Sequence, residues 1–378
     1  MSDTTSRPAT PRRRPLAVAL LAGAVALTIG MAPASADTAS WRSVAPEGLS
    51  DAILDDVSTE QGVTWTAGLD VSDRSPLALR WNGTGWTRTP QPAAHGRVND
   101  IAAAPGGEAW AVGYKEEGTR QEGTQQDTPT VQHWDGASWK FEDLPLPADA
   151  VAGFYAVAVS PRGTVWVGGG LSSDDPGGEP LLMTRSPQGE WRNTEIPADA
   201  AVGSTISVLP LAEDDVWLVG AKGVTHFDGT TWTRQRLPAH LDGQAFSLGA
   251  IAQRKPGEIW AVGLVEDDKL WRRPVVLRLY HGRWEEVPTP KETAQLQGIT
   301  FDEQDRPVIV GETFDPAVDP DFTYVLTMDR AGHLVRGQQP PGSGRLYAAD
   351  IDDQGRIWVS GANDDPSGLH VPYVAVRD

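Results

Sequence analysis

One short phrase recurs seven times along the chain, and its spacing constrains the fold more than any other feature. Each copy has an aromatic or aliphatic residue, two further residues and then a glycine. The copies are WTAG at 65–68, WAVG at 110–113, WVGG at 166–169, WLVG at 217–220, WAVG at 260–263, VIVG at 308–311 and WVSG at 358–361. The intervals are 45, 56, 51, 43, 48 and 50 residues. Such a period indicates one supersecondary unit repeated along the chain.

A second phrase lies between these copies and gives the content of each unit. It reads WNGTGW at 81–86, HWDGASW at 133–139, SPQGEW at 186–191, HFDGTTW at 226–232 and LYHGRW at 279–284. Asn-Gly and Asp-Gly pairs favour tight hairpins, because type I′ turns need positive φ at both central residues. Each unit therefore predicts four strands, A to D: a small-residue run, the glycine phrase, a strand before the hairpin, and a strand that begins with the second Trp.

The two ends of the chain predict how the units close. The last unit stops at Asp378 without a strand D, whereas WRSVAP at 41–46 has a strand D phrase and no preceding A, B or C. The N-terminal strand should complete the last unit, which closes a ring and removes free sheet edges. The sequence thus predicts an all-β, seven-bladed β-propeller over residues 37–378, as a single domain.

These repeats resemble secreted propellers of high-GC bacteria that carry WAVG and HWDGTSW repeats and, more distantly, kelch, WD-type and Asp-box propellers. The resemblance spans residues 39–378. No WD series and no double-glycine kelch signature occurs, and only DDQGRIW at 352–358 approaches an Asp-box. Propellers of these families include lectins, scaffolds and enzymes, so the resemblance implies the fold rather than an activity.

The first 36 residues predict export. Arg12, Arg13 and Arg14 precede the uncharged run 16–32, and Ala34-Ser35-Ala36 is a small-residue cleavage signature, so we expect a signal peptide cleaved after Ala36. The alternative is a retained anchor, but a run of about 17 residues is short of the roughly 20 that span a bilayer. We therefore expect an extracellular protein with no stable membrane insertion after cleavage; the Sec and twin-arginine routes both stay open.

Composition narrows the possible partners. The chain has no Cys, which excludes disulfides and thiolate metal sites. Its net charge of -19 repels phosphate backbones, so we expect no nucleic acid partner.

Loop lengths point to one face of the ring. Connections B to C are long in six units (69–76, 114–129, 170–180, 264–274, 312–322, 362–372), whereas the fourth unit has only 221–223. Long loops on a rigid scaffold usually carry function, although they are also common as solvated decoration. We expect the ligand on this face, with a notch over the fourth blade.

Residues in these loops are candidates for ligand contact. Trp271 is an aromatic side chain among charged ones, which suits a sugar face or a protein hot spot as well as simple packing. The candidate set is Trp271, Asp267, Asp268, Arg272, Arg273, Asn363, Asp364 and Asp365. Carboxylates also cluster at 174–175, 315–321 and 364–365, where Ca²⁺ could bind, but no calcium-loop pattern occurs and solvated turn aspartates are the favoured interpretation. No other cofactor is indicated.

The inner strands offer a further cluster. Asp56, Asp100 and Asp350 are predicted at one equivalent position in blades one, two and seven, so they should converge near the channel. They could bind a cation or act as an acid/base pair, or they could accept backbone N–H groups between blades.

No GxSxG, HExxH or phosphate-loop motif occurs, and the seven His have no metal-ligand spacing. We therefore predict a non-enzymatic binding protein that presents its B–C loops to a glycan, as a lectin does, or to a secreted or cell-surface protein. The alternative is an extracellular hydrolase or lyase that uses the channel carboxylates.

Overall fold

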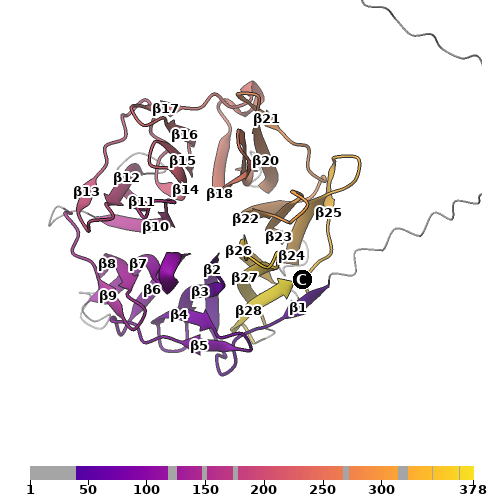
Figure 1. Ribbon diagram of the computed structural model, residues 1–378. Helices are drawn as coiled ribbons and strands as arrows, with labels where there is room; N and C mark the ends of the chain where they lie inside the picture. Colours follow the sequence, from indigo (N-terminus) through magenta and orange to yellow (C-terminus); the bar gives the residue numbers. More distant parts are fainter. Residues whose placement is uncertain are drawn as a thin grey trace, which may run out of the picture. The chain divides into compact units, whose positions relative to one another are not determined.

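A computed structural model describes residues 40–117, 126–146, 151–172, 178–266, 272–313, 322–342, 344–365 and 367–378. Ala39–Asp378 forms one compact unit. Its strands make seven antiparallel sheets of four strands each, arranged as blades around an axis (Figure 1). The predicted seven-bladed β-propeller is therefore confirmed.

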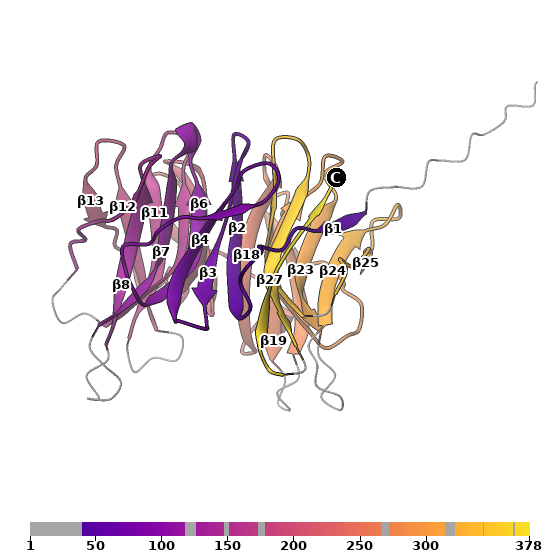
Figure 2. The ribbon, with the colours of Figure 1, turned by 90° about the horizontal axis from the view of Figure 1, so that it is seen from below.

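The strands follow the chain from the inner to the outer edge of each blade (Figures 1 and 2). Blade one contains β2 (Ala52–Glu60), β3 (Val63–Asp70), β4 (Ser75–Trp81) and β5 (Trp86–Arg88), and blade two contains β6 (Gly96–Ala103), β7 (Ala109–Glu117), β8 (Gln126–Trp134) and β9 (Trp139–Phe141). Blade three contains β10 (Ala152–Val159), β11 (Val165–Leu171), β12 (Glu179–Arg185) and β13 (Trp191–Asn193), and blade four contains β14 (Thr205–Ala212), β15 (Asp215–Gly220), β16 (Gly223–Phe227) and β17 (Trp232–Arg234). Blade five contains β18 (Ala245–Lys255), β19 (Glu258–Glu266), β20 (Arg272–Tyr280) and β21 (Arg283–Glu286), and blade six contains β22 (Ala294–Phe301), β23 (Pro307–Thr313), β24 (Phe322–Met328) and β25 (Leu334–Arg336). Blade seven contains β26 (Arg345–Ile351), β27 (Ile357–Asp364), β28 (His370–Arg377) and, as its outer strand, β1 (Trp41–Ser43). Two short 3-10 turns, η1 (Pro105–Gly107) and η3 (Ala239–Leu241), complete the described elements.

The first strand closes the ring as the sequence predicts. β1 pairs with β28, with Trp41 opposite Arg377, so the outer strand of blade seven comes from the N-terminal end. The Trp41 indole also donates a hydrogen bond to the Gln338 carbonyl, 2.8 Å away. The last blade is thereby tied to both ends of the propeller unit.

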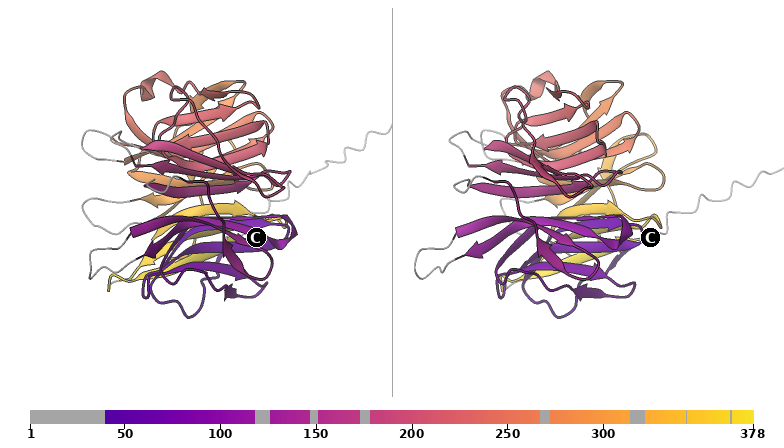
Figure 3. Two further views of the ribbon diagram at one scale, coloured as in Figure 1. Left: turned by 90° about the vertical axis from the view of Figure 1, so that its left-hand side faces the viewer. Right: turned by 60° about the vertical axis from the view of Figure 1, so that its left-hand side comes forward.

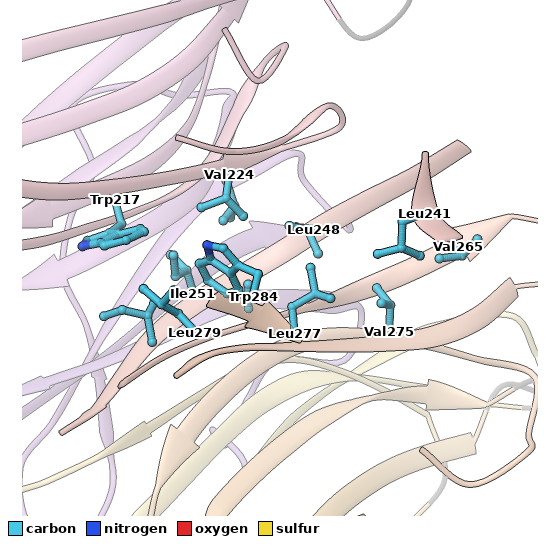
Figure 4. Packing of buried hydrophobic residues seen from close by; sticks show 13 residues of the cluster. Trp217, Val224, Leu241, Leu248, Ile251, Val265, Val275, Leu277, Leu279 and Trp284 are labelled. Carbon is cyan, nitrogen blue, oxygen red and sulfur yellow. The ribbon is translucent and has the colours of Figure 1, made fainter. Parts of the chain in front are cut away.

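The hydrophobic core is divided among the seven interfaces between neighbouring blades. Between blades four and five, for example, Trp217 packs with Leu248, Ile251 and Trp284 (Figure 4). Figure 3 shows the same stacking of blade on blade from the side. The Trp residues of the two repeated phrases, here called the Trp columns, thus hold neighbouring blades together.

Every inner strand carries a β-bulge at one shared register. In blade one, the pairing of β2 with β3 shifts between Leu54 and Asp56, which leaves residue 55 unpaired. The same shift occurs in each of the other six blades. A bulge bends its strand and re-aims one side chain.

The glycine of the repeated phrase exists to admit this bulge. A Cβ built on Gly68 would lie well inside 3.0 Å of the Ile53 carbonyl, closer than real Cβ atoms approach. The phrase glycine of each other blade meets the corresponding carbonyl in the same way. This glycine is the most regular residue of the sequence repeat, and it allows the bulge residue of each blade to face the axis.

The connections B to C are partly strand rather than loop. β7 and β8 remain paired as far as Glu117 and Gln126, and β27 and β28 as far as Asp364 and His370. Much of the segments predicted as long B–C loops is thus paired β-strand that extends beyond the ring of blades. The face with the B–C connections is called the loop face, and the face with the A–B and C–D turns is called the turn face.

Candidate functional site

The unpaired bulge residues line the axial channel. One comes from each blade, and together they form what we call the bulge ring: Asp55, Asn99, Tyr155, Ile206, Gly249, Gln297 and Tyr347. All of them border a cavity of about 690 Å³ between the inner strands. This volume suits a small ligand, because ligand pockets commonly measure roughly 300 to 1,000 Å³.

The bulge ring differs from blade to blade. Tyr155 is 43% exposed, and its phenol ring lies back along the strand over Gly153, where a Cβ would come within 2.8 Å of the Tyr155 Cζ atom. Asn99 donates to the Phe154 carbonyl at 2.7 Å, which fixes its amide beside the tyrosine. Blades four and five contribute only Ile206 and Gly249. The polar and aromatic groups therefore lie on one side of the channel.

An ion pair joins blades one and two at the same level. Arg97 donates from Nε to Asp55 Oδ2 at 2.7 Å, and a second guanidinium nitrogen contacts the other carboxylate oxygen. Burial raises the pKa of Asp55, and the Arg97 guanidinium opposes that shift. The pair forms a bidentate, partly buried unit that presents fixed charges to a ligand.

Two of the three predicted channel aspartates join neighbouring blades. Asp56 accepts the Ile101 N–H at 3.1 Å, and Asp100 accepts the Val157 N–H at 2.6 Å. Both border the channel cavity. Each carboxyl thus satisfies a backbone donor on the next blade, which is the structural alternative anticipated for these residues.

Asp350 also borders the channel, but the expected equivalence with Asp56 is wrong. The bulge in β26 places Ala348 at the position of Asp56, and Asp350 lies two residues further along, opposite Trp358. Asp56 and Asp100 directly follow the bulge residues of their strands, whereas Asp350 lies three residues after the bulge residue Tyr347. Asp350 accepts the Thr59 N–H at 2.8 Å and the Thr59 hydroxyl at 3.1 Å, which joins blade seven to blade one.

Burial raises the pKa of all three carboxyls, so they are weaker acids than usual. Burial and the adjacent Asp100 carboxyl raise the pKa of Asp56 well above its ordinary value. Burial also raises the pKa of Asp100, and it raises the pKa of Asp350 to about 6. Asp56 therefore takes up a proton more readily than Asp100, because the adjacent carboxyl raises its pKa further.

The predicted loop residues do not form one constellation among the described contacts. Arg272, on blade five, donates to the Gln295 side chain at 3.0 Å. Arg273 is ion-paired with Glu286, which also contacts His240. These arginines therefore brace blade five against its surroundings.

On blade seven, Asp365 stabilises its own turn: it accepts the Ser367 N–H at 2.7 Å and the Leu369 N–H at 3.0 Å. The Ser367 hydroxyl lowers the pKa of Asp365. Asn363 is different, because its buried Oδ1 atom has no hydrogen-bond partner within the described part of the chain.

Several predicted residues lie outside the described residues. These are Asp267, Asp268 and Trp271, the side chain of Asp364, and the carboxylates at 174–175 and 315–321. Among the described side chains, no group of three or more His, Asp or Glu is placed to hold a metal ion. None of the described helices is long and apolar enough to cross a membrane.

A scan against protein-family models and a comparison with curated proteins gave no match. Solved structures do match. Virginiamycin B lyase from Staphylococcus aureus has a TM-score of 0.62 at 12% identity, covering 90% of this chain and 99% of that one. The xyloglucanase from Xanthomonas campestris has a TM-score of 0.56 at 16% identity, covering 88% of this chain and 55% of that one.

An extracellular domain of a protein assigned to a one-component system in B. thetaiotaomicron also matches, with a TM-score of 0.58, 8% identity and coverage of 89% and 39%. At these identities the likeness shows the propeller fold alone. The similar structures include enzymes and extracellular domains, so a general binding or enzymatic role is as far as they reach.

The bulge ring itself was missed by the sequence reasoning. Its members lie fourteen residues before the phrase glycine in six blades and thirteen before it in blade one. Counting back a fixed distance from the repeated phrase could have found them.

Proposed function

We propose that this chain is a secreted, non-enzymatic binding protein that takes a glycan at the channel mouth on its loop face. The observation that carries the proposal is the bulge ring, which directs one side chain from each blade into a single cavity. Export rests on the N-terminal signal sequence, and the loop face is the one toward which the longest connections extend.

A glycan fits this cavity better than a flat protein surface does. Tyr155 and Tyr347 supply aromatic area, and the amides of Asn99 and Gln297 supply paired donors and acceptors. Aromatic rings that pack on sugar faces, beside a few fixed polar groups, are what a hydroxyl-rich ring requires. Because the bulge residues are not the same in all blades, the cavity forms one site rather than seven equal ones.

The ligand enters over blade four. β15 and β16 are joined through Ala221 and Lys222 alone, so this blade has no extension on the loop face. Its bulge residue, Ile206, and that of blade five, Gly249, give the same side of the channel no polar bulge residue. A chain-like glycan would lie across this notch, next to Arg272 and Arg273 of blade five. Trp271, Asp267 and Asp268 stay contacts predicted from the sequence. Asn363, Asp364 and Asp365 would flank it from blade seven.

A hydrolase or lyase is the second candidate, and one observation favours it. The Asp56–Asp100 pair combines two buried carboxyls, one of which takes up a proton more readily than the other, as acid/base chemistry needs. Both carboxyls are also engaged by backbone N–H groups of the next blade, which restrains them from moving toward a substrate. We therefore rank binding first.

The test is a glycan array probed with the protein purified from culture supernatant, followed by titration of the best glycan. Tyr155→Ala should weaken binding by about tenfold, because a stacking aromatic contributes on the order of 1 to 2 kcal/mol. Tyr280→Ala is the matched control: Tyr280 is 41% exposed, close to the 43% of Tyr155, but it lies on the turn face.

Four outcomes decide between the candidates. Loss of binding with Tyr155→Ala alone supports the loop-face site. Equal loss with Tyr280→Ala places the site elsewhere. If no glycan binds and a secreted protein co-purifies in stoichiometric amount, the partner is a protein. Turnover of the bound glycan that is lost in Asp56→Asn would favour the enzyme.

A further inference from the structure

We propose that a second binding site lies on the turn face, at blade one, and that it takes an organic carboxylate carried on a ring-sized molecule. This site is independent of the loop-face site. It is a cavity of about 630 Å³ bordered by Arg80, Trp81, Asn82, Trp134, Gln354 and Arg356 among others. None of the described residues that border it is acidic, although the chain as a whole carries a net charge of -19.

Arg80 is the cation of this cavity. It lies opposite Trp65 in the sheet, and its guanidinium stands 5.8 Å from the centre of the Trp65 ring. Within the described part of the chain, no carboxylate forms an ion pair with it. The second arginine, Arg356, is already bonded to Asp352 at 2.7 Å.

Blade five shows what the same position looks like when its charge is satisfied internally. Arg278 lies opposite Trp260 and also stands 5.8 Å from the Trp ring centre. The residue facing Arg278 on strand D is Glu285, and the two form an ion pair. In blade one, the residue facing Arg80 is Thr87. The blade-one arginine thus lacks the internal carboxylate that its counterpart has.

A buried donor adjoins this cation. The Trp134 side chain is 7% exposed, borders the cavity and has an indole N–H without a hydrogen-bond partner among the described residues. Unpaired buried donors are uncommon and costly, so a ligand acceptor at this position would be stabilising. The Arg80 guanidinium and the Trp134 ring lie 5.8 Å and 5.5 Å from the Trp65 ring centre, and both residues border the cavity, so one carboxylate could accept from both.

The other residues that border the cavity indicate what kind of molecule carries the carboxylate. The Trp81 ring is half-buried and offers an apolar surface, and the side chains of Asn82 and Gln354 add amides. A six-membered ring with a carboxylate fits these groups. Two sources share that chemistry, an acidic sugar and an aromatic acid, and a sugar acid and an aromatic acid used as separate probes distinguish them.

The experiment titrates the full secreted protein with D-glucuronate, D-glucose and benzoate, and follows binding by calorimetry and ligand-observed NMR. Two variants remove the proposed cation: Arg80→Gln deletes it, and Thr87→Glu supplies the internal carboxylate that blade five already tolerates. Arg278→Gln is the matched control, because it removes an arginine of the same register that is already paired. Thermal unfolding of each variant checks that it is folded.

The expected result is binding of glucuronate but not glucose, weakened about tenfold or more in Arg80→Gln and Thr87→Glu and unchanged in Arg278→Gln. Binding of benzoate in place of glucuronate would assign the aromatic source to the same site. The proposal is overturned if glucose binds as tightly as glucuronate, if Arg278→Gln has the same effect as Arg80→Gln, or if neither acid binds at about 50 mM. Tyr155→Ala should leave this binding intact, which separates it from the loop-face function.

Discussion

Replacement of Gly361 by Ala tests the link between the sequence repeat and the channel. Gly361 ends the phrase WVSG and faces the bulge that directs Tyr347 into the channel. A new Cβ would press on the Arg345 carbonyl, with the carbonyl carbon only 2.9 Å away. Because both partners are backbone atoms of paired strands, the clash is relieved only by displacing the bulge.

The expected cost is about 3 kcal/mol, at the upper end of what overpacking in a well-packed interior causes. For about 340 residues the entropy of unfolding is roughly 0.7 kcal/mol per kelvin, so the melting temperature should fall by about 4 °C. Differential scanning calorimetry of the purified variant measures both quantities. Displacement of Tyr347 should also weaken the glycan selected by the array.

Gly249→Ala is the matched control, since its new Cβ would meet its nearest atoms at 3.4 to 3.5 Å, an ordinary contact. It should change stability by less than about 0.5 kcal/mol. If Gly361→Ala melts within about 1 °C of the wild type, the bulge does not require a glycine opposite it, and close approach to the carbonyl is refuted as the origin of the repeated glycine.

Three further changes follow from the same contacts. Burial raises the pKa of Asp350 from 3.8 to about 6, so the stability that its protonated form contributes is complete below pH 3.8 and is lost as the pH rises through 6. Relative to Asp350→Asn, the wild type should lose up to about 3 kcal/mol of unfolding free energy between pH 4 and pH 7. The loss is smaller where channel water screens the charge. A pH-independent difference in urea unfolding would contradict this. Trp358→Ala should lower the free energy of unfolding by roughly 3 to 5 kcal/mol, because the side chain is fully buried and donates a hydrogen bond to Asp352. Trp232→Ala should lower it less, because Trp232 is only half-buried. Equal urea midpoints for the two variants would argue against blade-to-blade packing by the Trp columns. Trp41→Ala should speed hydrogen exchange in β28, since β1 covers its outer edge, and unchanged protection there would mean that closure does not depend on this residue.

The sequence by itself determined the number of blades and how the ring closes. Both depend on local, repeated requirements: a glycine wherever a bulge brings a carbonyl close, a Trp wherever two blades meet, and a tight turn at each hairpin. WRSVAP at 41–46 and the missing strand D after β28 fit together because a sheet edge must be paired. Such constraints recur at a fixed spacing, so a single chain displays them several times.

Only the tertiary structure decided what the residues at the channel and on the turn face do. Asp350 is offset from Asp56 because it lies three residues after the bulge of β26, whereas Asp56 directly follows the bulge of β2, and the position of a bulge is fixed by strand pairing. Arg80 and Arg278 look alike in sequence, and they differ only in what strand D places opposite them, Thr87 or Glu285. Whether a charge is already satisfied depends on partners brought in by strand pairing and ring closure, and these distances are set by the assembled blades rather than by spacing along the chain.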